Sequence, residues 1–143
     1  MKKKQGIAIL LFAIVLYVVV LHATTVARIF QSIAAGLLGR ASYSGGAATV
    51  ALGVACHLTV AYGWTTLFYV AARRAPSLRD LTRSSIGSLT VGLLYGVVVW
   101  LGMDFVVIPL SRATPTAVSN WRFWALLGWH AVGVGLPIVK ILR

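Results

Sequence analysis

The sequence predicts an all-α polytopic membrane protein, a bundle of four transmembrane helices with an amphipathic segment between the first and the second. Two observations lead to this fold class. Apolar residues make up 59% of the 143 residues and charged residues only 10%, whereas soluble domains contain about 25% charged residues. The apolar residues also gather in four long stretches separated by short basic segments, the arrangement expected of membrane spans and their loops.

The four stretches cover approximately residues 6–22, 47–72, 85–110 and 123–142. A helix needs roughly 20 apolar residues to cross the hydrocarbon core of a bilayer, so the last three are long enough and the first is the shortest. The first follows three lysines as a signal peptide would, but small residues typical of a cleavage site are poorly placed after it. We therefore expect it to remain as the first transmembrane helix of a single membrane domain covering residues 1–143.

Residues 26–39 form the predicted amphipathic segment between the first two spans. Large apolar side chains recur there at helical spacing, at Ile29, Phe30, Ile33, Leu37 and Leu38. Such a segment is expected to lie in the membrane interface or to continue the first helix obliquely. The glycine- and serine-rich residues 42–46 are expected to end it.

The orientation follows from the basic residues, which favour the cytoplasmic side of a membrane. Of the thirteen lysines and arginines, nine fall on one predicted side: Lys2, Lys3, Lys4, Arg73, Arg74, Arg79, Arg83, Lys140 and Arg143. The other side has four: Arg28, Arg40, Arg112 and Arg122. We therefore expect both termini to be cytoplasmic.

The remaining composition argues against several classes of function. The net charge of +11 comes from short clusters between apolar runs, so it predicts membrane loops and not a nucleic-acid-binding face. Cys56 is the only cysteine, so no disulfide framework is predicted. The sequence has no GxSxG, HExxH, P-loop or CxxC motif, and we expect neither an enzymatic activity nor a dedicated cofactor.

Small residues predict close helix packing. Ser88, Gly92 and Gly96 lie four residues apart in the third stretch, and Ala131 and Gly135 have the same spacing in the fourth. This pattern lets helix backbones approach each other closely in a membrane. We expect packing within the chain, with homodimerisation through the same faces as the alternative.

One group of polar residues is a candidate site. Asp104 is the only acid within a predicted span, where an ionisable group is costly unless paired or hydrated. Counted from the outer ends of their helices, Asp104 lies about 9 Å deep, His130 about 10 Å and His57 about 15 Å, and His22 lies at the outer end of the first span. His57, Asp104 and His130 therefore form a candidate intramembrane polar cluster.

Several roles fit that cluster. It is expected to be a hydrogen-bonded group that fixes the bundle, and Thr59 and Tyr95 are candidate further members. The alternatives are a proton-linked pathway, a transition-metal site, or a haem held between His57 and His130. The spacing of the residues favours no particular metal.

Several segments of the chain resemble the YagU-like family of uncharacterised bacterial inner-membrane proteins. They are residues 28–39, the His57 helix ending at residues 67–72, residues 92–100, residues 104–111, and the Gly128-Trp129-His130 helix ending at residues 135–138. The resemblance implies four spans in the inner membrane, a loose link to acid tolerance and no catalytic residues. In the family the position of Asp104 is often Asn or His, which weakens a strict carboxylate role.

Three functional hypotheses follow. The first is a non-enzymatic accessory or stability factor that contacts the lipid bilayer and either a larger membrane complex or further copies of itself. The second is a haem- or metal-binding redox subunit using His57 and His130. The third is a small proton-linked transporter or channel.

Overall fold

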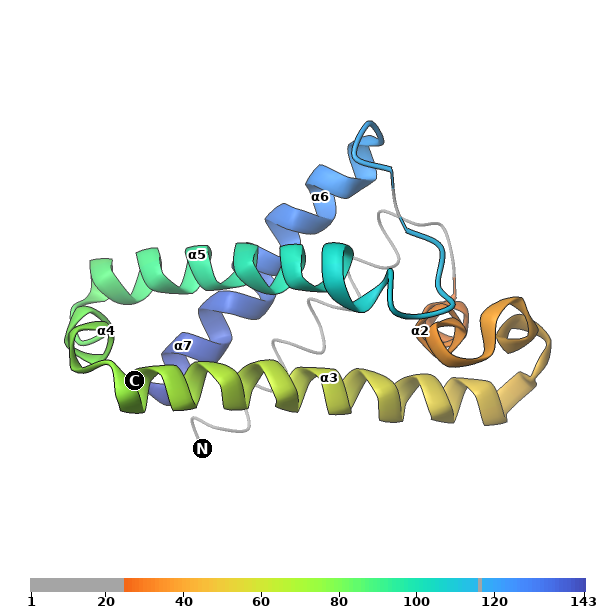
Figure 1. Cartoon of the computed structure of the whole chain (residues 1–143), viewed down its shortest axis with the longest axis horizontal. Helices are drawn as coiled ribbons and strands as arrows, with labels where there is room; N and C mark the ends of the chain where they lie inside the picture. Colours follow the sequence, from red (N-terminus) through yellow and green to blue (C-terminus); the bar gives the residue numbers. More distant parts are fainter. Residues whose placement is uncertain (1–24, 116) are drawn as a thin grey trace. The chain divides into compact units, whose positions relative to one another are not determined.

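The computed structural model describes residues 25–115 and 117–143, and these residues form helices with no strand among them (Figure 1). The short elements are a 3-10 helix (η1) and two π-helical segments (η2 and η3). In chain order the elements are α2 (Val26–Leu38), η1 (Gly39–Ser44), α3 (Gly46–Arg74), α4 (Pro76–Leu81), α5 (Ser85–Gly102), η2 (Met103–Val107), α6 (Trp121–Trp129), η3 (His130–Gly135) and α7 (Leu136–Leu142).

Three helices within the described residues are long and apolar enough to cross a membrane. They are α3, α5 continued by η2, and the C-terminal helix made of α6, η3 and α7. They correspond to the predicted spans 47–72, 85–110 and 123–142. The first predicted span, residues 6–22, lies outside the described residues, so the four-helix bundle stays a prediction.

The boundaries of two spans differ from the prediction for local reasons. The predicted end of the third span at residue 110 was wrong, because the helix ends at Val107. Pro109 disfavours helical geometry at Ile108, so the apolar run extends beyond the end of the helix. The last span begins at Trp121, two residues before the prediction, because the Asn120 side chain accepts a hydrogen bond from the Arg122 amide and caps the helix.

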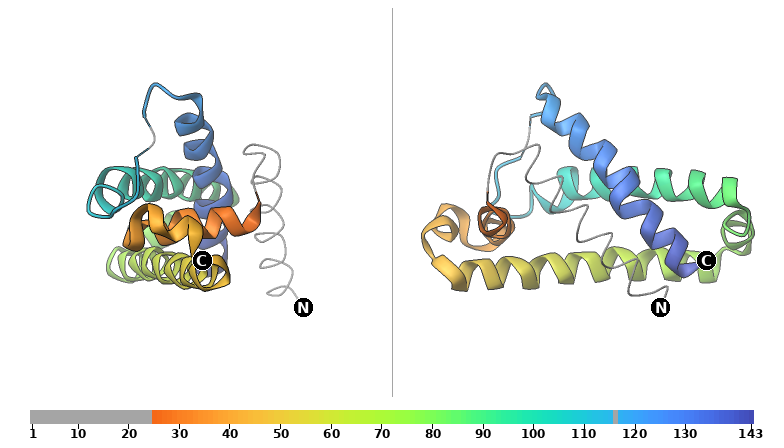
Figure 2. Two further views of the ribbon diagram at one scale, coloured as in Figure 1. Left: turned by 90° about the vertical axis from the view of Figure 1, so that its right-hand side faces the viewer. Right: turned by 180° about the vertical axis from the view of Figure 1, so that it is seen from behind.

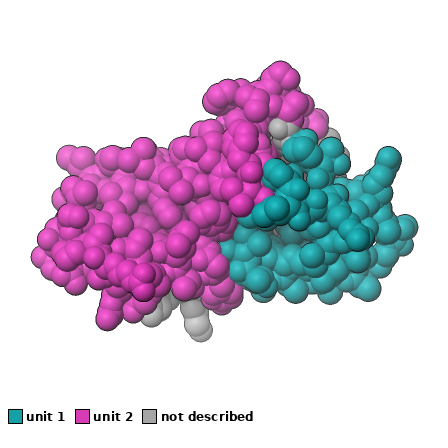
Figure 3. Space-filling model, in the orientation of Figure 1, with its two compact units in different colours: residues 1–61, 107–115 teal, residues 62–106, 116–143 magenta. Residues whose placement is uncertain are grey.

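The described residues divide into two compact units (Figure 3). The first contains residues 25–61 and 107–115, and the second contains residues 62–106 and 117–143. Helix α3 contributes its first part to one unit and its last part to the other. Each unit has its own buried side chains and is described separately.

In the first unit, α2 packs on α3 through small and polar residues. The buried residues of α2 are Gln31, Ala34 and Ala35, whereas Leu37 and Leu38 are exposed. The two helices approach closely at one point: Gly53 of α3 lies so near the Phe30 carbonyl that no side chain fits between them.

The turn after α2 also differs in position from the prediction. Helix α2 ends at Leu38 because Gly39 adopts φ 63°, a left-handed geometry that favours glycine. The predicted breaking segment, residues 42–46, instead forms the end of η1 and the start of α3, and Gly46 has φ 57°. The segment predicted to end α2 therefore starts the next helix.

The core of the second unit lies between α5 and the C-terminal helix. Its most buried apolar side chains include Phe68, Val99, Trp100, Phe123 and Val139. The C-terminal helix crosses α5 obliquely, and α6, η3 and α7 follow one another without a break (Figures 1 and 2). The Trp100 and Phe123 rings meet edge to face with centroids 5.5 Å apart, a favourable aromatic geometry.

Prolines follow both π-helical segments. Segment η2 ends two residues before Pro109, and η3 ends two residues before Pro137. A proline ring clashes with the carbonyl four residues earlier, and a local π adjustment is one way in which a membrane helix accommodates it. The C-terminal helix thus continues past Pro137 to Leu142.

Candidate functional site

The candidate site in the second unit is built around Asp104. This residue is the second residue of η2 and is only 5% exposed. Its Oδ1 atom has no hydrogen-bond partner among residues 25–115 and 117–143. A buried carboxylate oxygen without a partner is costly, and π-helical segments are frequent at functional sites. Asp104 therefore combines an unpartnered buried oxygen with a position in a π-helical segment.

Trp100 is the nearest polar neighbour of Asp104 along the helix. It lies four residues earlier, which places both side chains on the same helix face. Trp100 is also 5% exposed, and its indole Nε1–H likewise has no acceptor within the described part of the chain. One face of this helix thus presents an unpaired buried donor one turn from an unpaired buried acceptor.

His130 reaches the same region from the C-terminal helix. Its ring lies 4.8 Å from the Trp100 ring, centroid to centroid, at an angle of 45°. Its Nδ1 atom is 2.8 Å from the carbonyl oxygen of Leu126, one turn earlier on its own helix. In this geometry Nδ1 carries the hydrogen and donates a hydrogen bond to the carbonyl. In the neutral ring Nε2 is then the nitrogen with acceptor character.

His57 belongs to the first unit. It is half-buried on α3, and the edge of its ring meets Phe30 of α2 with centroids 6.3 Å apart at 74°. The structure therefore brings Asp104 and His130 to the surroundings of Trp100 in the second unit, and it places His57 beside Phe30 in the first. No group of three His, Cys, Asp or Glu side chains within residues 25–115 and 117–143 is arranged to hold a metal ion.

The two further candidates of the polar cluster bond to backbone carbonyls. The Thr59 hydroxyl donates to the Ala55 carbonyl of its own helix, at 2.9 Å. The Tyr95 hydroxyl donates across to the Trp64 carbonyl of α3. Only Tyr95 therefore joins two helices.

The small residues of α5 and the C-terminal helix meet each other. Ser88, Gly92 and Gly96 are all buried on α5, and Ala131 and Gly135 are buried in η3. A methyl group added to Gly96 would overlap the His130 carbonyl, and one added to Gly135 would overlap the Gly92 carbonyl. We call these five residues the small-residue seam. Because the seam is filled within one chain, it is not a free surface for homodimerisation.

Trp100 was not predicted as a member of the site. Its spacing of four residues from Asp104 was the available signal, since residues four apart share a helix face. The contact between Trp64 and Met103, whose indole Nε1 and sulfur are 3.4 Å apart, was not predicted either. Tryptophan is also common at membrane interfaces, so its presence alone does not indicate a buried contact.

No protein-family model, no curated protein and no solved structure matches this chain.

Proposed function

We propose that the chain is a non-enzymatic protein of the bacterial inner membrane that packs against a larger membrane protein as an accessory or stability subunit. The proposal includes the YagU-like resemblance, a fourth span formed by residues 6–22, and cytoplasmic termini. One observation carries it. A polar stripe, defined as Tyr62, Thr66 and Tyr69, runs along the exposed side of α3.

The polar stripe is unsuited to lipid. Its three residues follow the three-and-four spacing of one helix face, and Tyr62 is 70% exposed. Tyr62 lies twelve residues before the end of α3 at Arg74, which is about 18 Å along the helix. A phenolic hydroxyl at that depth finds no hydrogen-bond partner among lipid tails, and polar residues there normally bond to a neighbouring helix.

The rest of α3 supports the same conclusion. Only 11% of the residues in its most apolar stretch are buried, compared with 28% in the helix containing α5. The face of α5 marked by Leu94, Val98 and Leu101 is also exposed, and it is apolar apart from Thr90 one turn before Leu94, which suits lipid. The exposed face of α3 is therefore more polar than that of α5, and it is the face better suited to contact another protein.

Photo-crosslinking in native membranes tests this assignment. A benzophenone amino acid placed at Tyr62 should form adducts with another membrane protein, because the polar stripe faces that protein. The same amino acid at Leu94 is the matched control, since that site is 62% exposed on an apolar face, and it should react with lipid. Mass spectrometry of the adducts is the measurement.

Two results would contradict the assignment. Adducts with lipid alone at both positions would show that the polar stripe has no protein neighbour. Adducts of the chain with a second copy of itself would assign the stripe to self-association and would remove the accessory role. As an independent check, the double variant Tyr62→Leu with Thr66→Ala should recover at least tenfold less partner in mild detergent than Leu94→Ala.

The buried acid favours a second candidate, a proton-linked transporter or channel. Asp104 is the only carboxyl group within the three membrane-length helices, and its Oδ1 has no partner within the described residues. Intramembrane acids of this kind often mark ion or proton pathways. Four short helices enclose little volume, so such a pathway would require several copies of the chain.

Proton flux into proteoliposomes tests this candidate. Asp104→Asn should reduce the flux at least tenfold, because the amide cannot release a proton. Asp80→Asn is the control: this acid is exposed, and it forms an ion pair with Arg83. Equal flux through the unchanged chain and the Asp104→Asn variant would eliminate the candidate.

A further inference from the structure

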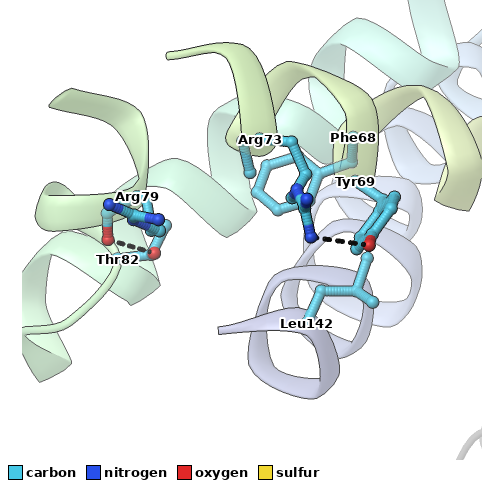
Figure 4. Close-up of a pocket in the computed structure, with 7 residues that line it drawn as sticks. Phe68, Tyr69, Arg73, Arg79, Thr82 and Leu142 are labelled. Atoms are coloured by element: carbon cyan, nitrogen blue, oxygen red, sulfur yellow. Dashed lines mark hydrogen bonds between the residues drawn. The ribbon is translucent and has the colours of Figure 1, made fainter. Parts of the chain in front are cut away.

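A small cavity opens in the second unit where α3, α4 and α7 end close together (Figure 4). Its volume is about 60 Å³. Ligand sites for small molecules measure about 300–1,000 Å³, so this cavity admits only a group of a few heavy atoms. Arg73, Tyr69, Arg79 and Thr82 supply its polar walls, and Phe68 and Leu142 supply apolar ones.

The polar walls favour an anion. Two guanidinium groups, from Arg73 on α3 and Arg79 on α4, line the cavity, and no carboxylate among the described residues does. The neighbouring acid Asp80 lies 3.6 Å from Arg83 instead. Guanidinium groups match phosphate oxygens in geometry and charge, so the chemistry of the cavity points to a phosphate group.

The structure holds part of this site in place. Arg73 donates a hydrogen bond to the Tyr69 hydroxyl at 3.3 Å, and its guanidinium lies 5.8 Å from the centre of the Tyr69 ring. Thr82, which is 3% exposed, donates to the carbonyl of Arg79 at 2.8 Å and so fixes the end of α4 beside the cavity. Figure 4 shows both hydrogen bonds. A fixed side chain loses less freedom when it binds.

The apolar walls indicate where the anion comes from. Phe68 and Leu142 belong to membrane-length helices, and the basic residues Arg73 and Arg74 form the last turn of α3. The cavity thus combines cationic groups with apolar surface at the point where a span ends. A free phosphate ion has no apolar part to contact the apolar walls, whereas a phospholipid carries its phosphate close to its acyl chains. Basic pockets of this kind between transmembrane helices bind acidic lipid headgroups.

We propose that this cavity binds the phosphodiester of an anionic phospholipid, with Arg73 and Arg79 contacting the phosphate oxygens. Phe68 and Leu142 contact the first carbons of the acyl chains. This lipid site shares Tyr69 with the polar stripe but includes neither Tyr62 nor Thr66 nor Asp104, and it requires only that the helices lie in a membrane.

Lipid-dependent thermal stabilisation of the purified full chain in detergent tests the proposal. Phosphatidylglycerol should raise the melting temperature, and phosphatidylcholine at the same concentration should raise it much less. The double variant Arg73→Gln with Arg79→Gln should weaken phosphatidylglycerol binding about tenfold. The matched control is Arg74→Gln with Arg83→Gln, which removes the same charge from the end of α3 and from the turn after α4, at residues that do not line the cavity.

Three outcomes would overturn the proposal. Equal loss of binding in the control variant would show general attraction of basic loops to an anionic surface. Equal stabilisation by inorganic phosphate would assign the cavity to a soluble anion. Unchanged binding in the Arg73→Gln, Arg79→Gln variant, with its melting temperature in lipid-free detergent preserved, would place the lipid elsewhere. If that variant fails to fold, Tyr69→Phe, which removes only the hydroxyl beside Arg73, should still weaken binding severalfold.

Discussion

Gly96→Ala is expected to destabilise the second unit by about 3 kcal/mol, at the upper end of the usual cost of overpacking. The added methyl group would overlap the His130 carbonyl and the Ala131 backbone. These are main-chain atoms in the middle of a helix, so no side-chain rotation can relieve the overlap. The two helices would have to separate along the small-residue seam, and packing along the seam would be lost. SDS-driven unfolding in mixed micelles is a suitable measurement.

Gly128→Ala is the matched control for this substitution. Gly128 lies on the same C-terminal helix as the seam, and a methyl group there meets no atom within 4 Å. Alanine is the better helix former by about 1 kcal/mol, so this variant should be neutral or slightly more stable. If Gly96→Ala unfolded at the same SDS fraction as Gly128→Ala, the close crossing of α5 and the C-terminal helix would be wrong.

Asp104→Leu is expected to stabilise the chain by about 2 kcal/mol, because it removes a buried acceptor without a partner and a carboxyl group from the interior of a membrane helix. Leucine branches at Cγ as aspartate does, so the apolar replacement keeps the shape of the side chain. Residues that serve function commonly lower stability, and their replacement raises it. The same unfolding titration gives the measurement.

Two further variants make this expectation specific. Asp104→Ala adds no volume and should stabilise in the same direction by about 1 kcal/mol, which separates the effect from any overpacking by leucine. Asp104→Asn keeps a polar group at the site and should change stability least. Destabilisation by both Leu and Ala would mean that the carboxyl group holds the bundle together, as the structural interpretation of the cluster predicts.

The three helices long and apolar enough to cross a membrane could be predicted because they depend on composition and length alone. An apolar run of 20 or more residues with few charges has few alternatives to a membrane helix, and three of the four predicted spans coincide with helices of that kind. The ends of helices depend on single residues. Pro109 and Asn120 determine where two spans end and begin, and Gly39 determines where α2 ends.

The candidate site was predicted less completely, for a physical reason. Depth along a helix follows from counting residues, and this placed His57, Asp104 and His130 at similar levels. Which way a side chain points around its helix depends on the contacts of that helix, which the count does not contain. The small-residue seam could be predicted from the four-residue spacing of small residues, because close backbone approach depends on residue size. The cavity at Arg73 and Arg79 could not be predicted, because it requires residues 68–82 to meet Leu142, which lies far away in the sequence.

The π-helical geometry of η3 affects how the end of the chain should be interpreted. A π turn holds one residue more than the α turn it replaces, and one residue corresponds to about 100° of rotation. A helical wheel drawn continuously from Trp121 to Leu142 is therefore out of phase by that angle beyond Gly135. Deleting one residue within η3 would restore α geometry and leave the last seven residues on the faces they now occupy, because the π segment already contains the extra residue. Val139, now fully buried, would therefore stay on the buried face, although a continuous helical wheel of the unchanged sequence places it on another one.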